Sequence, residues 1–427
     1  MKVPYVCLVA LLCTLVLSPH AKGEKPSLQS IIDDAEAGGE IVIPSGYYTE
    51  NIVISKPLTL IGGKNVTIHS CEETPVVTIE GSRVNIRNLT IEQCSEESEG
   101  PPAIYVTGTT HRLEDLAVDT TQIGIQLSEA DRVNILKSSI TGRINGNGID
   151  LWTSNDNVMA KLSLKDTIDG IYMEQSDGNE VSDSKMENAR YGVHLMFSND
   201  TVIRRNISHH NFTGAMVMKA KQTVISRNIF AENNQNVNSQ GLLLYEADDT
   251  KVSFNEFDSN RVGAFIEKSG GSFFKENIFQ SNMIGVQMKE SRENTITHND
   301  FSGNVNDVHE VDSKENTLSQ NYWDASLKLD VNGDQYSEIP YKADPYFLTL
   351  TEKVPEYQLF FQNPGLNLVK QVFNSPAATV LSDTKPTMVP KHINNPNKNK
   401  KQIPLWVIGS VFLILNLLII QKWRNVK

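Results

Sequence analysis

The segment Gly170–Met196, GIYMEQSDGNEVSDSKMENARYGVHLM, contains one complete repeat and the start of the next. Each repeat opens with a glycine followed by alternating apolar residues, as in GIYM from position 170 and GVHL from position 192. The same pattern begins at eight glycines: Gly124, Gly148, Gly170, Gly192, Gly214, Gly241, Gly263 and Gly285. Their spacings of 24, 22, 22, 22, 27, 22 and 22 residues show a period near 22 through the middle of the chain.

Asparagines recur in phase with these glycines. One series is Asn206, Asn228, Asn255, Asn277 and Asn299, and another is Asn211, Asn260, Asn282 and Asn304. A period near 22 is too short for a pair of helices, and the segments are β-rich and bounded by Asn, Asp and Gly, so each repeat is predicted to form one turn of a parallel β-helix. Leucine-rich repeats have a similar period, but their Leu-x-x-Leu-x-Leu signature is missing here. Identical side chains stacked about 4.8 Å apart can hydrogen-bond as a ladder at the corners, where glycine is expected to permit the backbone conformation.

The fold class predicted is therefore all-β: a right-handed parallel β-helix of about a dozen coils, in a domain that spans residues 24–345. The spacing of Leu28, Ile31, Ile32 and Ala35 predicts a short amphipathic helix before the first strands. Such a helix would cap the open end of the β-helix, which otherwise exposes unpaired backbone groups.

Both ends of the chain carry membrane-related patterns. Residues 1–23 resemble a cleaved secretory signal peptide, and residues 404–421 are apolar enough for one transmembrane helix with a short cytoplasmic tail at 422–427. The repeat domain is then held on the extracytoplasmic face of the membrane. Between them we expect a helical docking segment at 346–374, which lies on a membrane partner or caps the solenoid, and a flexible linker at 375–403. The net charge of −12 argues against nucleic acid as a partner.

Two cysteines remain after removal of the signal. Cys71 and Cys94 are 23 residues apart, and Ile68 matches Ile91 in the same register, so the cysteines should lie on adjacent coils. In an oxidising compartment this pair predicts a disulfide, with a metal site built from two thiolates as the alternative.

The outward positions of the repeat carry a candidate metal site. The first and third residues after each glycine are apolar and should point inward, so the second and fourth point outward. On two neighbouring coils these outward positions hold one histidine and three methionines: His194, Met196, Met216 and Met218. Imidazole with thioethers is a soft ligand set that selects Cu(I). Exposed methionines also suit an adaptable protein-docking surface, and the two roles are compatible.

Aromatic and aliphatic residues extend this surface into a predicted docking patch made of Tyr172, Leu243, Tyr245 and Phe265. Met173 and Met288 are inward and belong to the core. His209 and His210 fall at a corner outside this face, either solvated or as auxiliary ligands.

A polysaccharide-acting enzyme is the main alternative. Asp150 and Glu174 lie diagonally on adjacent coils, roughly 8 Å apart by strand geometry, within the range of inverting glycosidases. Trp152 and Tyr172 beside them could stack on sugars. A purely adhesive or scaffolding repeat protein is the second alternative.

The repeat ends at NYWDASLKLDVNGDQYSEIPY, residues 321–341. Asp330, Asn332, Asp334 and Glu338 could supply oxygen ligands to calcium there, or form a metal-free polar turn.

Four segments together resemble the NosD family of accessory proteins for nitrous oxide reductase maturation. They are EIVIPSGYYTENIVISKPLTLIGG, ARYGVHLMFSND, the closing segment above, and YQLFFQNPGLNLVKQVF, and the resemblance covers nearly all of the exported part. It implies a copper-handling protein without catalytic activity. Its implied partners are an ABC transporter ATPase and permease, a copper chaperone and apo nitrous oxide reductase, whose copper-sulfur centre it helps to assemble. The membrane anchor is a departure from the family pattern.

Overall fold

The computed structural model describes residues 27–95, 100–343 and 380–391. The predicted signal peptide, docking segment, transmembrane helix and tail lie outside these residues. Within them, no helix has both the length and the apolar character needed to cross a membrane.

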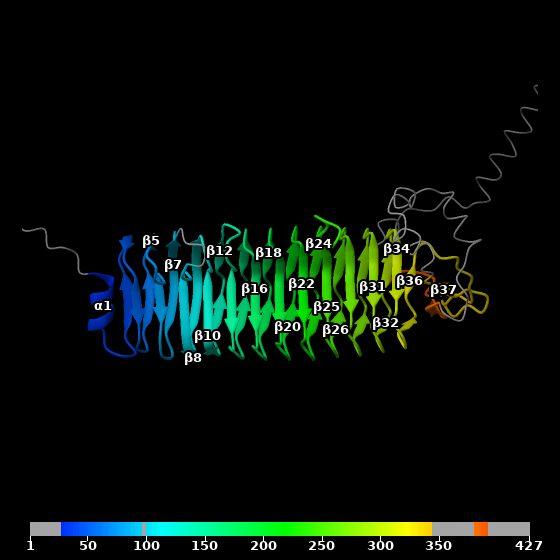
Figure 1. The fold of residues 1–427 in the computed structure, drawn as a ribbon, viewed down its shortest axis with the longest axis horizontal. Helices are drawn as coiled ribbons and strands as arrows, with labels where there is room; N and C mark the ends of the chain where they lie inside the picture. The colour runs from blue at the N-terminus through cyan, green and yellow to red at the C-terminus, as the bar shows by residue number, and fades with distance from the viewer. Residues whose placement is uncertain (1–26, 96–99, 344–379, 392–427) are drawn as a thin grey trace, which may run out of the picture.

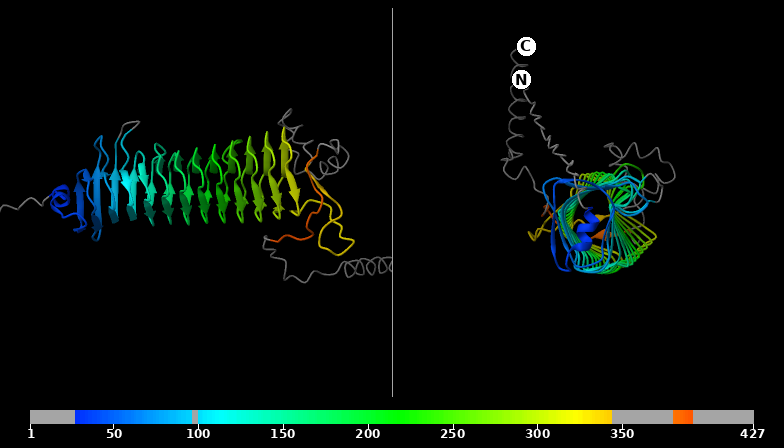
Figure 2. Two further views of the ribbon diagram at one scale, coloured as in Figure 1. Left: turned by 90° about the horizontal axis from the view of Figure 1, so that it is seen from below. Right: turned by 90° about the vertical axis from the view of Figure 1, so that its left-hand side faces the viewer.

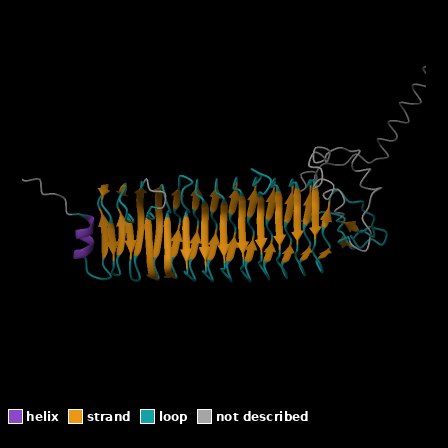
Figure 3. Cartoon of the chain, in the orientation of Figure 1, coloured by secondary structure: helices purple, strands orange, loops and turns teal. Residues whose placement is uncertain are grey.

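The chain winds into a long parallel β-helix whose strands form two sheets (Figures 1 and 3). Sheet B contains one strand from each coil: β3 (Ile52–Ile54), β6 (Val77–Ile79), β8 (Ile104–Thr109), β10 (Ile125–Asp131), β13 (Ile149–Trp152), β16 (Asp169–Glu174), β19 (Tyr191–Met196), β22 (Thr213–Met218), β25 (Gln240–Tyr245), β28 (Val262–Glu267), β31 (Ile284–Lys289) and β34 (Asn306–Val311). These twelve strands confirm the prediction of about a dozen coils.

Sheet A contains two rows of strands. The first row is β1 (Glu40–Ile43), β4 (Thr59–Gly62), β11 (Asn134–Leu136), β14 (Val158–Ala160), β17 (Glu180–Ser182), β20 (Val202–Arg204), β23 (Val224–Ser226), β26 (Lys251–Ser253), β29 (Phe273–Lys275), β32 (Thr295–Thr297) and β35 (Thr317–Ser319). The second row is β2 (Gly46–Thr49), β5 (Val66–Ser70), β12 (Ser139–Thr141), β15 (Ser163–Lys165), β18 (Lys185–Glu187), β21 (Ile207–His209), β24 (Ile229–Ala231), β27 (Glu256–Asp258), β30 (Ile278–Gln280), β33 (Asp300–Ser302) and β36 (Tyr322–Trp323). The long strands β7 (Asn85–Gln93) and β9 (Arg112–Thr120) belong to both rows.

Helix α1 (Leu28–Asp34) caps the first coil, as predicted. Leu28 and Ile32 are buried, and the backbone N–H of Leu28 donates to the Glu50 carboxylate at 2.8 Å. The view along the long axis in Figure 2 shows α1 lying across the end of the coils. The helix therefore covers apolar side chains that the first coil would otherwise expose.

The inside of the coils is apolar and regularly stacked. Aromatic rings form a continuous column in the later coils, with centroid separations of 5.2 Å for Phe230–Phe257, 4.7 Å for Phe257–Phe279 and 4.8 Å for Phe279–Phe301. Trp323 and Tyr341 continue the column. Met173 and Met288 are fully buried in the core, as expected.

The asparagine ladders are present, and their members are buried apart from the half-buried Asn304. In the first ladder the side-chain amide of Asn255 donates to Asn277 Oδ1 at 3.0 Å, and Asn277 donates to Asn299 Oδ1 at 2.9 Å. Each Oδ1 also accepts from a backbone N–H one coil earlier, as Asn277 Oδ1 does from Asn255 at 2.9 Å. The ladder therefore satisfies corner backbone groups that the sheets leave unpaired.

The role predicted for the repeat glycines is wrong. No left-handed backbone conformation occurs at Gly192 or Gly214; residues such as Asp183 (φ 53°) and Arg205 (φ 55°) take it at the corners instead. A Cβ at Gly192 would lie 2.5 Å from the carbonyl oxygen of Gly214. Glycine is therefore required there because successive coils approach closely, not because of its backbone freedom.

The linker prediction is wrong for residues 380–391, which pack on the last coil. Strand β38 (Ser382–Asp383) pairs antiparallel with β37 (Tyr341–Lys342) and parallel with β35. The buried Asp383 carboxylate accepts from the Asn321 backbone N–H at 2.8 Å and from Trp323 Nε1 at 3.2 Å. This segment therefore caps the C-terminal end of the β-helix.

Candidate metal centre

The four predicted ligands lie together on the outer face of sheet B. They come from the adjacent strands β19 and β22, whose register pairs His194 with Met216 and Met196 with Met218. The alternating residues Val193, Leu195, Ala215 and Val217 are buried in the core, so these four side chains lie on the opposite face. The three methionines are half-buried, and His194 is only 8% exposed.

His194 is held by a buried carboxylate that was not predicted. Asp169, the first residue of β16, accepts from His194 Nδ1 at 2.9 Å and is itself fully buried. Arg190 donates to the same carboxylate twice, from Nε at 2.9 Å and from Nη2 at 2.8 Å. Burial alone would raise the pKa of Asp169, but the hydrogen bonds from His194 and Arg190 outweigh it and lower that pKa below its ordinary value. The carboxylate is therefore ionised and can only accept.

This hydrogen bond decides which imidazole nitrogen can bind a metal. Because Asp169 only accepts, Nδ1 of His194 must carry the proton, and the neutral ring then has its free lone pair on Nε2. That Nε2 atom is buried and has no hydrogen-bond partner. A buried nitrogen left unpaired in this way is costly unless a ligand satisfies it. A carboxylate on the opposite nitrogen is the arrangement found around metal-binding histidines.

Two tyrosines form the walls around His194. The ring centroids of Tyr172 and Tyr191 lie 5.0 Å and 4.7 Å from that of the imidazole, both edge-on. The Tyr172 hydroxyl donates to the Glu174 carboxylate and also lies 3.5 Å from Met196 Sδ. Burial, followed by the bond to Glu174, raises the pKa of Tyr172, so its hydroxyl stays protonated. The donor set is thus one shielded imidazole with thioethers beside it, which is chemically suited to Cu(I).

Sequence reasoning missed Asp169, Arg190 and Tyr191. All three lie one or two positions before a repeat glycine, whereas the inward–outward alternation was counted only after it. The register shows that the position before the glycine continues the strand, because Asp169 pairs with Tyr191. An acidic residue at 169 and an aromatic residue at 191 were the signal available at this position, and Arg190 lies one residue before Tyr191.

The predicted docking patch continues this surface. Leu243 pairs with Met216 and with Phe265, and Tyr245 pairs with Met218. Tyr172, Leu243, Tyr245 and Phe265 are all half-buried. The methionines and the patch thus form one continuous outer face.

The carboxylate pair proposed for sugar cleavage is on adjacent coils, but Asp150 is buried and Glu174 is half-buried. Asp150 is only 3% exposed and accepts from Asn147 Nδ2 at 2.6 Å. Burial, with a contribution from the charge of Asp169, raises its pKa to about 6. The Glu174 carboxylate is bonded to Tyr172. This pair therefore does not present two free carboxylates to a polysaccharide.

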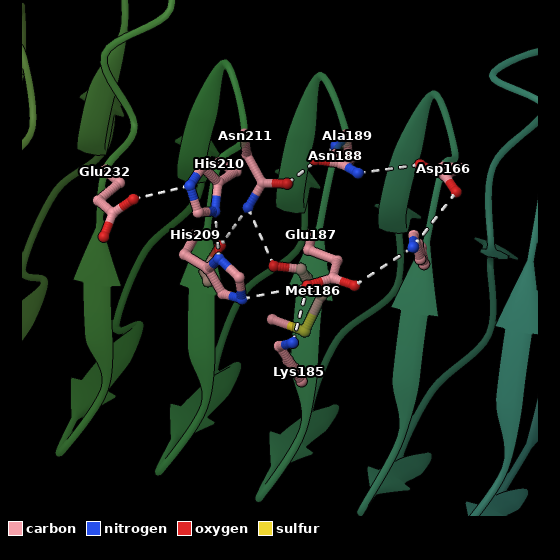
Figure 4. Close-up of polar contacts among 12 residues, drawn as sticks. Asp166, Lys185, Met186, Glu187, Asn188, Ala189, His209, His210, Asn211 and Glu232 are labelled. Atoms are coloured by element: carbon pink, nitrogen blue, oxygen red, sulfur yellow. Dashed lines mark hydrogen bonds and ion pairs between the residues drawn. The ribbon is translucent and has the colours of Figure 1, made fainter.

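His209 ends β21 of sheet A and His210 follows it at the corner, whereas the four predicted ligands lie on sheet B. His209 Nε2 lies 3.3 Å from the Glu187 carboxylate, and His210 Nε2 lies 2.7 Å from that of Glu232. Figure 4 shows the two rings side by side between these glutamates. The histidines thus pair with carboxylates at a surface corner, and nothing in their contacts supports the auxiliary-ligand role.

The calcium prediction receives no support from its loop. Asp330 Oδ1 accepts from the Gly333 backbone N–H at 2.6 Å, Asn332 Oδ1 from Asp334 at 2.8 Å, and Asp334 Oδ1 from Tyr336 at 2.9 Å. These bonds fold a polar turn, and calcium binding at this loop stays a prediction.

A second cluster of possible metal ligands lies on the early coils. Cys71 and Cys94 form a disulfide between adjacent coils, and His69 lies beside them. Within the described residues this is the one group of at least three His, Cys, Asp or Glu side chains whose ligand atoms all lie within 4.8 Å of one another.

Comparison with known proteins identifies the family. The model of the periplasmic copper-binding protein family NosD matches residues 129–343, half of the chain, including every predicted copper ligand. The chain belongs to the NosD family. The description of this family agrees with an extracytoplasmic location and with a role for copper.

Solved structures similar to this NosD-family chain include two epimerases. The periplasmic alginate epimerase AlgG matches at 14% identity with a TM-score of 0.53, covering 68% of this chain and 82% of its own. The Azotobacter vinelandii mannuronan C-5 epimerase AlgE4 A-module matches at 14% identity with a TM-score of 0.44, covering 69% of this chain and 89% of its own. At these identities the likeness shows the fold alone. A search of curated proteins gave no match.

Proposed function

We propose that this protein binds Cu(I) through His194, Met196, Met216 and Met218 and passes it on during assembly of the copper site of nitrous oxide reductase. The observation that carries the proposal is the buried, unpaired Nε2 of His194, whose opposite nitrogen is fixed by Asp169. Met216 is its direct register partner, and Met196 and Met218 form the next pair on the same face. The family description supports copper as the metal.

The half-buried position of the site fits a protein that hands copper on. Thioether ligands are neutral and exchange more readily than thiolates, and the methionines lie at an accessible surface beside the aromatic patch. We propose that this patch contacts the partners implied by the family resemblance: the ABC transporter, a copper chaperone and the apo-reductase. The predicted transmembrane helix at 404–421 would keep the β-helix on the extracytoplasmic face, near a membrane-bound transporter.

Anaerobic titration of the full chain with Cu(I) against a chromophoric Cu(I) chelator tests the site. We expect a quadruple variant, His194→Gln with Met196→Ser, Met216→Ser and Met218→Ser, to lose one equivalent of bound Cu(I). The matched control is His210→Gln with Met283→Ser, which removes a histidine and a methionine from elsewhere on the surface and should keep that equivalent. Equal stoichiometry and affinity in both variants would reject the site.

The maturation role is tested in a strain that lacks the protein. Restoring the quadruple variant should give reductase with a reduced copper content, whereas the control variant should restore it. Normal copper loading by the quadruple variant would show that the site does not serve the reductase.

A polysaccharide-binding function is the second candidate, and one observation favours it. Trp152 is 41% exposed and packs edge-on against Tyr172 with ring centroids 5.8 Å apart, which gives an aromatic surface for a sugar ring. Incubation with alginate and polygalacturonate, followed by NMR analysis of the polymers, tests it. Unchanged polymers and no binding would exclude this function.

A further inference from the structure

Cys71 and Cys94 are held together by the sheet as well as by their disulfide. They directly follow the paired strand ends Ser70 and Gln93 of β5 and β7, and their Cα atoms are 4.6 Å apart. The Cys94 backbone N–H donates to the Ser70 carbonyl at 3.3 Å, so the parallel pairing continues to this point. Because this backbone pairing does not depend on the disulfide, reduction would leave two thiols side by side on adjacent coils.

His69 is placed against both sulfur atoms. Its Nε2 lies 3.5 Å from Cys71 Sγ and 3.7 Å from Cys94 Sγ. Its other nitrogen, Nδ1, is buried without a hydrogen bond and lies 3.6 Å from the Glu92 carboxylate. A disulfide that only staples two coils does not require an imidazole against both of its sulfurs. A carboxylate on the far side of that imidazole is the partner a metal-binding histidine needs.

The cluster can be reached from solvent. Cys71 is exposed, Cys94 is half-buried, and the His69 side chain is 23% exposed. A dithiol reductant can therefore attack the disulfide, and a metal carrier can approach the ligands. Tyr47 lies over the imidazole with ring centroids 5.4 Å apart and donates to Glu92 at 3.1 Å, so one side of the cluster is enclosed.

We propose that Cys71, Cys94 and His69 form a second, redox-gated Cu(I) site. A protein dithiol supplies two electrons and two protons to the Cys71–Cys94 bond, giving two thiols and a disulfide on the reductant. One Cu(I) then displaces the two thiol protons and is bound by two thiolates and Nε2 of His69. When a protein disulfide takes two electrons back from the pair, the Cys71–Cys94 bond re-forms and two thiolates are left on the oxidant. Both sulfur ligands are then lost, Cu(I) is released and the site closes.

The number of ligands at this cluster favours Cu(I) over Zn²⁺. Structural Zn²⁺ sites are almost always tetrahedral with four protein ligands, whereas this cluster offers three. Two thiolates and one imidazole form a soft set of three ligands, which suits Cu(I). The cluster lies on sheet A, about 20–25 Å along the axis from His194 at about 4.8 Å per coil, so the two sites cannot share one ion.

The test uses the full chain carrying the quadruple variant described above, so that the His194 centre is absent and the two proposals fail separately. After reduction with a phosphine and its removal under anaerobic conditions, the protein is titrated with Cu(I) against a chromophoric chelator. We expect one equivalent to bind to the reduced protein, with a thiolate-to-copper absorption band, and none to the oxidised protein. Zn²⁺ is titrated in parallel.

The proposal would be overturned by no binding after reduction, by equal binding in both redox states, or by preference for Zn²⁺. His69→Gln should weaken Cu(I) binding by more than about 10-fold, the lower end of the effect of losing an outer-shell partner. His298→Gln, at a histidine in the corner between β32 and β33, should leave Cu(I) binding unchanged. Unchanged affinity in His69→Gln would also overturn it. The Cys71→Ser, Cys94→Ser variant should bind no Cu(I) with an unchanged far-UV circular dichroism spectrum. Should that variant not fold, the His69→Gln comparison decides.

Discussion

Nδ1 of His194 donates a 2.9 Å hydrogen bond to Oδ2 of Asp169 across two adjacent coils of sheet B. Arg190 neutralises the charge of this buried carboxylate from the other side. The imidazole is thereby fixed in one tautomer and one orientation. This hydrogen bond is the contact that separates a metal-binding histidine from a packing histidine, because it leaves Nε2 of His194 as the nitrogen that can bind a metal.

Replacing Asp169 tests that relationship. Asp169→Asn keeps the volume but removes the negative charge that His194 and Arg190 share, so the imidazole loses its fixed tautomer. We expect affinity for Cu(I) to fall by about 10- to 100-fold, the usual effect of losing an outer-shell carboxylate. Titration in competition with a chromophoric Cu(I) chelator measures this affinity. The control, Asp119→Asn, removes an exposed carboxylate paired with Arg143 and should leave affinity unchanged. Equal affinity in the two variants would mean that Asp169 is only structural.

Asp150 should make stability depend on pH. Its raised folded-state pKa means that the folded protein holds the proton more tightly than the unfolded chain. Stability should therefore fall as the pH rises from about 4 to about 6 and stay level above that. A rise in the pKa from its ordinary 3.8 to about 6 corresponds to ~3 kcal/mol.

The variant Asp150→Asn removes this dependence while retaining an oxygen that can accept from Asn147. We expect it to be more stable than the unmodified protein by up to ~3 kcal/mol at pH 7.5 and equally stable near pH 4. Urea unfolding at both pH values measures the difference, with Asp119→Asn as the exposed control. A variant that is less stable at pH 7.5 would show that the ionised carboxylate is needed.

The fold was predictable because a solenoid repeats its local rules. The alternation after each glycine assigned inward and outward positions correctly on β19 and β22, and the asparagine period predicted the ladders. The glycines were misread, because a close approach between coils leaves the same sequence signal as a left-handed conformation. Asp169 and Arg190 were missed for two other reasons. The alternation was counted only after each glycine, and the histidine that Asp169 binds lies more than 20 positions away.

The C-terminal cap was not predictable from local sequence. Residues 380–391 are rich in proline, lysine and threonine and carry no β-period, so they resemble a linker. Their order comes from Asp383, which bonds to Trp323, 60 positions away. Such a contact is specified by the end of the solenoid and not by the segment itself.

The aromatic column should dominate stability in the later coils. Phe279 is fully buried between Phe257 and Phe301. We expect Phe279→Ala to lower the free energy of unfolding by about 3–5 kcal/mol, because the closely stacked coils cannot collapse into the cavity. Phe273→Ala, at a residue that is 40% exposed, should change it by no more than about 0.5 kcal/mol. Urea unfolding, monitored by circular dichroism, compares the free energies of unfolding of the two variants. Similar losses in both variants would contradict a close-packed column.

Asp383 should hold the last coil closed. Its carboxylate accepts from the backbone N–H groups of Gln320 and Asn321, from the side chain of Asn321, and from Trp323. Asn321 accepts from Asn299 and so continues the first asparagine ladder. In Asp383→Ala these buried donors lose their acceptor, at about 1–3 kcal/mol for each group left unpaired. We therefore expect amide hydrogen exchange to accelerate in β35 and β36 while the central coils keep their protection. Lys342→Ala, an exposed truncation on the neighbouring strand β37, is the matched control and should not change exchange. Uniformly faster exchange along the whole β-helix would show that the cap supports the entire domain, and unchanged exchange would show that the segment is dispensable.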